Sequence, residues 1–345
     1  MIRSLKVLLA PLILSALLLA ACGTGAPPPA GDPPATAGDP IKIGVLRIDD
    51  SIPFYVAEKE GLFAAGGVAV ELAPFNSSAD QSKAMEAGEL DMAMNDMIVQ
   101  ALMRKGGTAT KAVAVAFGAT PAEGRFLLVG APGSGLTPPA PGAADNRIVN
   151  AEGKTVAISS NTMMDYLLAQ FAGMGFFAPD LSDVRVISMP NLMLRVEALI
   201  EGRDVQMAIL PDPLASYAVL AGCPVLVDDT ALGVNLSQSV VLATETALNE
   251  RRDEVSRVLA AYFTAMERIN ENPEAYRDFC LETANVPAEL SAVYPTPSYT
   301  PGALPTAADV ARVMDWLVER GLLTEPYSYA EMADGSLAAN LSGAD

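Results

Sequence analysis

Between residues 41 and 96, short apolar runs alternate with helix-like stretches, and this alternation restricts the fold more than any other feature of the chain. The predicted strands are 41–46, 68–73 and 91–94, and the predicted helices are 52–63, ended by Gly61, and 79–87, ended by Gly88. Polar residues follow each strand. Because ligands bind beyond the carboxyl ends of strands in open α/β sheets, this β-α-β-α-β segment predicts half of a binding site.

The same order of elements returns after residue 154. The predicted strands are 155–158, 184–188 and 206–209, and the predicted helices are 163–174 and 191–200. A short phrase also recurs, with a glycine, a strand containing Met-Ala and then an aspartate, Asp96 or Asp212. The phrase is out of register between its two copies, so the repeated order of elements is the stronger evidence for a repeated unit.

About 300 residues of folded chain are too many for one core, so we expect an α/β protein with two lobes. Each lobe is an open sheet flanked by helices, and chain crossings near 120–131 and 230–245 would let the lobes close on a ligand. The predicted parts are a first lobe from 41–130, a second lobe from 131–229, a return to the first lobe with C-terminal helices over 230–325, and a tail over 326–345.

The N-terminus predicts export. Basic residues precede an apolar stretch that is too short to span a membrane, and small residues lead to Cys22. This pattern is typical of a bacterial lipoprotein signal at 1–21, with lipid on Cys22; the alternative is an ordinary secretory signal with an incidental cysteine. Residues 22–40 are rich in Gly, Ala and Pro and predict a flexible tether. We therefore expect an extracytoplasmic protein anchored to the cell membrane.

Charge and composition exclude several functions. The net charge of −19 argues against a nucleic-acid partner and against a polybasic grip on lipid. The chain has no histidine, which removes Ser-His and Cys-His catalysis and the commonest zinc ligand. We expect neither a cofactor nor a metal site, because Asp49-Asp50 and Asp228-Asp229 lack a closely spaced calcium loop. Cys223 and Cys280 are expected to be buried thiols, with a disulfide as the alternative.

Three stretches carry a family resemblance: 52–63, 67–71 and 86–93. They are similar to substrate-binding proteins of the nitrate, sulfonate, taurine and thiamine-pyrimidine type, which serve ABC importers. The resemblance covers roughly 41–325 and implies the two-lobed periplasmic-binding-protein type II fold. It also implies a small-molecule ligand, an ABC permease and ATPase as partners, and no catalytic residues. We expect a monomer. A related pyrimidine-making enzyme depends on a histidine and a pyridoxal cofactor, so the missing histidine argues against that activity.

In such proteins the turns after the strands touch the ligand between the lobes. Carried over by position, the candidate ligand-binding residues are Asp50, Ser51, Phe54, Asn76, Ser77, Asn95 and Asp96 in the first lobe and Ser159, Ser160, Asn161, Thr162 and Asp212 in the second. Several have a structural alternative. Asp50, Ser51, Ser159, Ser160 and Thr162 are also helix N-cap candidates. Phe54 and Phe75 are candidates for core packing as well as for stacking, and Asp212 for a plain turn.

The predicted turns are acidic, which bears on the ligand. Asp50, Asp96 and Asp212 accept hydrogen bonds from ring N–H, amino or hydroxyl groups and repel anions. We therefore expect a neutral or cationic nitrogen heterocycle, such as a thiamine pyrimidine or a flavin-like vitamin. A taurine-like sulfonate or nitrate is the alternative within the family, and an enzyme or a ligand sensor on the same scaffold is the alternative outside it.

Overall fold

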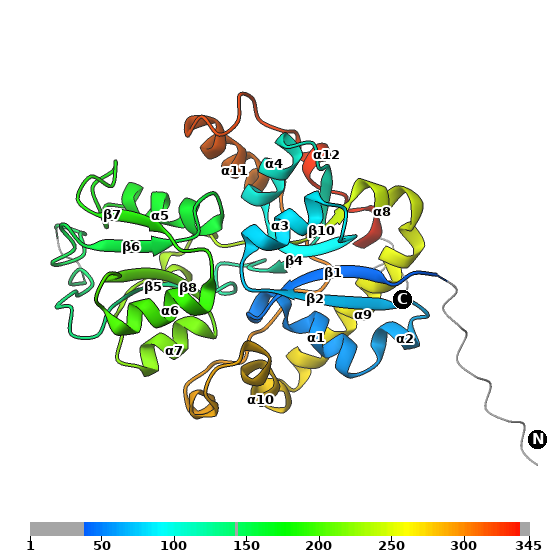
Figure 1. The fold of residues 1–345 in the computed structure, drawn as a ribbon, viewed down its shortest axis with the longest axis horizontal. Helices are drawn as coiled ribbons and strands as arrows, with labels where there is room; N and C mark the ends of the chain where they lie inside the picture. The colour runs from blue at the N-terminus through cyan, green and yellow to red at the C-terminus, as the bar shows by residue number, and fades with distance from the viewer. Residues whose placement is uncertain (1–37, 142–143, 339–345) are drawn as a thin grey trace, which may run out of the picture. The chain divides into compact units, whose positions relative to one another are not determined.

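The computed structural model describes residues 38–141 and 144–338, and Figure 1 shows their fold with most helices and strands labelled. The predicted signal segment, Cys22 and nearly all of the predicted tether lie outside the described residues, as do residues 339–345 of the predicted tail. Within the described ranges no helix is long and apolar enough to cross a membrane.

The first sheet has the strand order β2-β1-β3-β10-β4. Its strands are β1 (Ile41–Leu46), β2 (Val70–Phe75), β3 (Met92–Asp96), β4 (Thr110–Phe117) and β10 (Ser239–Thr244). β1 pairs in parallel with β2 and β3, whereas β10 is antiparallel to both β3 and β4. The predicted parallel unit is therefore present, and β10 returns to this sheet from a distant part of the chain.

The second sheet repeats the first, with the order β7-β6-β8-β5-β9. Its strands are β5 (Phe126–Gly130), β6 (Thr155–Ile158), β7 (Arg185–Ser188), β8 (Met207–Pro211) and β9 (Val225–Asp228). β6 is parallel to β7 and β8, and β5 is antiparallel to β8 and β9. The predicted boundary at residue 130 would leave β5 with the first lobe, but its hydrogen bonds place it in the second sheet. Two open mixed sheets confirm the predicted α/β class.

Helices flank both sheets. They are α1 (Ile52–Lys59), α2 (Leu62–Ala65), α3 (Ser78–Glu86), α4 (Met97–Lys105), α5 (Met163–Gly173), α6 (Leu192–Glu201), α7 (Leu214–Leu220), α8 (Glu245–Glu250), α9 (Arg252–Glu271), α10 (Pro273–Ala284), α11 (Ala307–Glu319) and α12 (Tyr329–Met332), with short 3₁₀ turns η1 (Asp49–Ser51), η2 (Asp229–Leu232) and η3 (Ala288–Ala292). Every residue of β3, β5, β6 and β8 is buried, as expected for strands covered on both faces.

Three local predictions differ from the structure. The single helix expected over 52–63 breaks into α1 and α2, because Gly61 takes the left-handed conformation with φ +69°. β3 extends through Asp96, so Asn95 and Asp96 end the strand rather than follow it. The predicted tail is packed where it is described: Met332 is fully buried, and Ala333 bridges to Ala112 of β4.

The two crossings between the sheets are bonded to each other. Ser237 Oγ lies within hydrogen-bond distance of the Gly124 carbonyl, at 2.5 Å, and of the Asp229 carboxylate, and its one proton can serve either acceptor. Asp229 Oδ1 accepts from Phe126 N at 2.9 Å. Gly118, with φ +81°, packs so closely here that an added Cβ would lie 2.0 Å from the carbonyl oxygen of Ser237. Ser237, Asp229, Gly118 and Gly124 therefore tie both crossings into one hinge. Elsewhere, Cys223 and Cys280 are buried free thiols, which confirms the expected state.

Candidate ligand chamber

A small cavity, termed the inner chamber, lies between residues of the two sheets. The first-sheet side supplies Leu46, Ile48, Asp50, Ser78, Met94, Asn95, Asp96 and Ser239, and the second-sheet side supplies Phe126, Ser159, Thr162, Met163, Met164, Pro190 and Leu192. The space open to the centre of a water-sized sphere is about 30 Å³, room for about two waters. The lobes are thus closed on each other, and a larger ligand requires them to separate.

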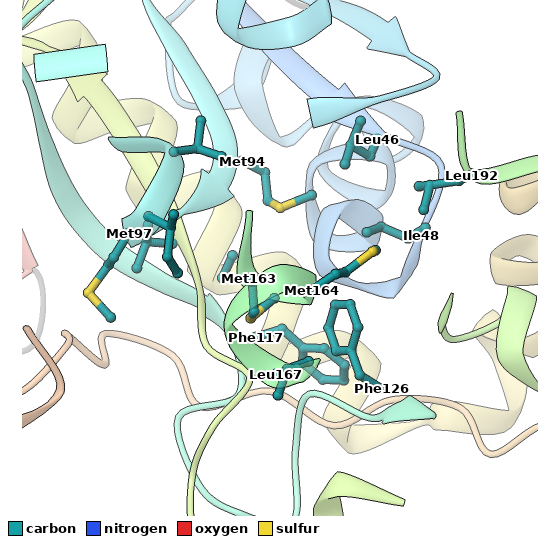
Figure 2. Close-up of a cluster of buried hydrophobic side chains, with 14 of the residues drawn as sticks. Leu46, Ile48, Met94, Met97, Phe117, Phe126, Met163, Met164, Leu167 and Leu192 are labelled. Carbon is teal, nitrogen blue, oxygen red and sulfur yellow. The ribbon is translucent and has the colours of Figure 1, made fainter. Parts of the chain in front are cut away.

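Apolar side chains fill most of this space. Figure 2 shows Met94 from β3 and Met163 and Met164 from α5 gathered with Leu46, Ile48 and Phe126. Methionine is unbranched and flexible, so such a wall can reshape around different ligand surfaces. The sequence does not mark these methionines as binding residues, since a methionine that lines a cavity and one that fills a core look alike in a sequence.

Asp96 joins the two lobes. Its Oδ1 caps α4 by accepting from Val99 N at 2.9 Å, and its Oδ2 accepts from Met163 N of α5 at 3.0 Å. Burial raises the pKa of Asp96 to about 6, while hydrogen bonds from the N–H groups of Met163, Val99 and Ile98 lower it. A carboxylate of the first lobe therefore occupies the N-terminus of a helix of the second, the position that attracts anions.

Asp50 also lines the chamber, and its carboxyl group and that of Asp96 form what we term the acidic wall. Asn95 lies beside them. The pKa of Asp50 is raised to about 6, chiefly by burial and also by the Asp96 charge, against the lowering effect of a hydrogen bond with Ser239. Asn95 is held on both sides, since its Nδ2 donates to Gln81 Oε1 at 2.7 Å and its Oδ1 accepts from Asp96 N at 2.9 Å. No Lys or Arg lines the chamber among the described residues. The polar part of the chamber therefore consists of carboxylates, hydroxyls and one amide.

The profile of the NMT1-like family matches residues 35–282, which is more than half of the sequence. The chain belongs to the NMT1-like family. A search of curated protein sequences found no match.

Solved structures similar to this NMT1-like chain share its architecture. The ligand-binding component of an ABC-type import system from Staphylococcus aureus, with zinc bound, is 16% identical at a TM-score of 0.69 over 88% of this chain and 99% of its own. The aliphatic sulphonate-binding protein SsuA of Escherichia coli is 19% identical at 0.65 over 88% and 100%. The nitrate-binding protein NrtA of Synechocystis PCC 6803 is 14% identical at 0.69 over 88% of each chain. These likenesses confirm the periplasmic-binding-protein fold and the resemblance seen in the sequence.

The structure brings five of the predicted site residues of this NMT1-like chain to the chamber: Asp50, Asn95, Asp96, Ser159 and Thr162. Thr162 also caps α5, as its Oγ1 accepts from Met164 N at 3.2 Å and donates to Ser159 O at 2.7 Å. Thr162 therefore both caps α5 and lines the chamber.

Ser51, Phe54 and Ser77 do not line the chamber. Ser51 Oγ accepts from Leu46 N at 3.1 Å inside the first lobe, and Ser77 caps α3 by accepting from Asp80 N at 3.1 Å. Phe54 is fully buried with its ring 4.2 Å from that of Tyr262.

The remaining second-lobe candidates, Ser160, Asn161 and Asp212, also lie off the chamber. Ser160 and Asn161 are exposed, and the positive φ of Asn161 turns the chain away before α5 begins.

The Asp212 carboxylate is paired within the protein. Its Oδ2 pairs with Arg125 Nη1 at 2.9 Å, and its Oδ1 accepts from the N–H and hydroxyl of Ser216. Its backbone still meets the other lobe, as Asp212 O accepts from Asp49 N at 3.2 Å. The sequence could not show this pairing, because Arg125 lies far from Asp212 in the chain. Asp212 shares Arg125 with Asp228 and lies outside the chamber lining.

A second and larger hollow, termed the vestibule, adjoins the chamber. Its lining is Arg47, Phe75, Asn76, Leu192, Met193, Leu214, Glu282, Ala284 and Asn285, and it measures about 410 Å³. Leu192 lines both spaces, and its N–H donates to Asn76 O of the other lobe at 3.2 Å. Asn76 is therefore placed in the vestibule rather than in the chamber.

Proposed function

We propose that the chain is the extracytoplasmic substrate-binding protein of an ABC importer and that it carries a neutral or cationic nitrogen heterocycle. A thiamine pyrimidine or a flavin-like vitamin fits this description. The NMT1-like family and the fold shared with import-system binding proteins support the transport role. We further propose lipid anchoring through Cys22 and delivery to a permease and ATPase.

The position of Asp96 carries the choice of ligand. Helix N-termini bind anions through free N–H groups and the helix dipole. Here Met163 N, at the N-terminus of α5, already donates a hydrogen bond to the Asp96 carboxylate at 3.0 Å. A nitrate or sulfonate would have to displace this group and would still face Asp50. A ring N–H or amino group can instead donate to the second lone pairs of both carboxylates.

The same arrangement bears on the alternatives. SsuA and NrtA are named for binding sulphonate and nitrate, so an anion is the second candidate for this chain. The acidic wall disfavours it. An enzyme on this scaffold would need an activated nucleophile, and among the described residues no Lys or His lines the chamber beside its hydroxyl groups.

The test is isothermal titration of the full chain, purified in mild detergent, with thiamine, its pyrimidine, riboflavin, taurine, alkanesulfonates and nitrate. We expect one heterocycle to bind, and Asp96→Asn to raise its Kd at least about tenfold, or about 1.4 kcal/mol. Asp180→Asn, which alters an exposed aspartate outside the site, should leave Kd unchanged. Tight binding of taurine or nitrate that survives Asp96→Asn would reject this ligand class.

A further inference from the structure

We propose that the vestibule is a second compartment of the ligand site and that it binds an anionic group, a carboxylate or a phosphate, at Arg47. This inference rests on the proposed function, since it gives the imported ligand two parts. The neutral or cationic heterocycle would be the head of the ligand, in the inner chamber, and an apolar or aromatic tail ending in an anion would occupy the vestibule.

Size is the first argument. The chamber offers about 30 Å³, whereas the vestibule offers about 410 Å³, within the range of small-molecule sites. The two spaces share Leu192, and the contact between Leu192 N and Asn76 O joins the lobes at that wall. A ligand with its head in the chamber therefore has room to extend past this wall.

Charge is the second argument. Arg47 is exposed, and its one hydrogen bond runs from Nη1 to the carbonyl of Thr283 at 3.3 Å. No carboxylate within the described ranges pairs with it, although the chain as a whole carries a net charge of −19. A guanidinium with free donors in a concave site is suited to a carboxylate or phosphate, which it can grip with two parallel hydrogen bonds.

The remaining lining fits the tail. Phe75, Leu192, Met193 and Leu214 offer apolar surface beside the charge, and the Phe75 ring gives a flat face for an aromatic group. Glu282 lines the same hollow and would repel an anion. Its removal should therefore tighten anion binding, the opposite of the effect expected for Arg47.

The probes are phenyl phosphate and benzoate, with benzyl alcohol as the neutral match, titrated into the full chain in detergent. We expect saturable binding of at least one anion and none of benzyl alcohol. Arg47→Gln should raise the Kd of that anion at least about fivefold, and Arg47→Lys should raise it less. Glu282→Gln should lower the Kd about twofold. The anion that binds more tightly identifies the tail as phosphate or carboxylate.

Two controls separate this inference from the proposed function. Arg203→Gln removes an exposed arginine of the second lobe that pairs with Glu201, and it should leave phenyl phosphate binding unchanged. Asp96→Asn is titrated with the chamber ligand alone, so failure of that test leaves the vestibule test standing. Absence of saturable anion binding, or binding that Arg47→Gln does not weaken, would overturn the vestibule whatever the chamber ligand proves to be.

Discussion

Asp50 carries a buried carboxyl group. Its pKa is raised from 3.8 to about 6, chiefly by this burial. Such a group is protonated more readily in the folded state, so its stabilising contribution is complete below 3.8 and is lost as pH rises through 6. Relative to Asp50→Asn, the wild-type free energy of unfolding should therefore fall by about 1–3 kcal/mol across this interval. Chemical denaturation at several pH values measures the difference between the two proteins.

Asp80 provides the matched control for this measurement. It is exposed, and its hydrogen bond with Ser77 lowers its pKa. Its contribution is present above the unfolded pKa and is lost as pH falls. The wild type should therefore gain stability relative to Asp80→Asn as pH rises, the opposite trend. A stability difference between wild type and Asp50→Asn that stays constant with pH would contradict the assignment of Asp50.

At the scale of elements, the hinge depends on the close packing of the two crossings. Gly118→Ala would place a methyl group 2.0 Å from Ser237 O at φ +81°, so both the clash and the backbone conformation oppose it. Gly61→Ala has a similar φ of +69° but meets nothing within 4 Å. We expect Gly61→Ala to cost about 1 kcal/mol and Gly118→Ala at least about 2 kcal/mol more, by urea denaturation. Equal costs would show that the crossings tolerate separation.

The whole molecule is closed around a chamber that is too small for a vitamin. Ligand entry therefore requires the lobes to part at Leu192 and Asn76, whose backbones touch across the two lobes. Replacing both residues with cysteine should give a disulfide that locks the lobes together. The oxidised protein should neither take up nor release ligand, and reduction should restore both, as stopped-flow measurements would show. The single-cysteine variants are the controls, and unchanged uptake by the oxidised protein would reject closure.

Sequence patterns predicted the repeated parallel units, because apolar runs, helix-ending glycines and polar strand ends are local signals. They also selected as ligand-binding candidates five residues that line the chamber, Asp50, Asn95, Asp96, Ser159 and Thr162. They missed Ser239, since it reaches the chamber only because β10 pairs antiparallel with β3. The pairing of Asp212 with Arg125 and the lining of the vestibule likewise depend on contacts between distant segments.

The exchange of strands between the two sheets has a consequence for synthesis. β10 separates β3 from β4, yet it follows the whole second sheet in the chain. The facing edges of β3 and β4 thus remain without a partner until residue 239 has left the ribosome. Pairing over such a span is slow, because the long intervening loop must close first. A nascent chain that completes its first sheet this late stays unfolded longer, which would suit the extracytoplasmic location that we propose.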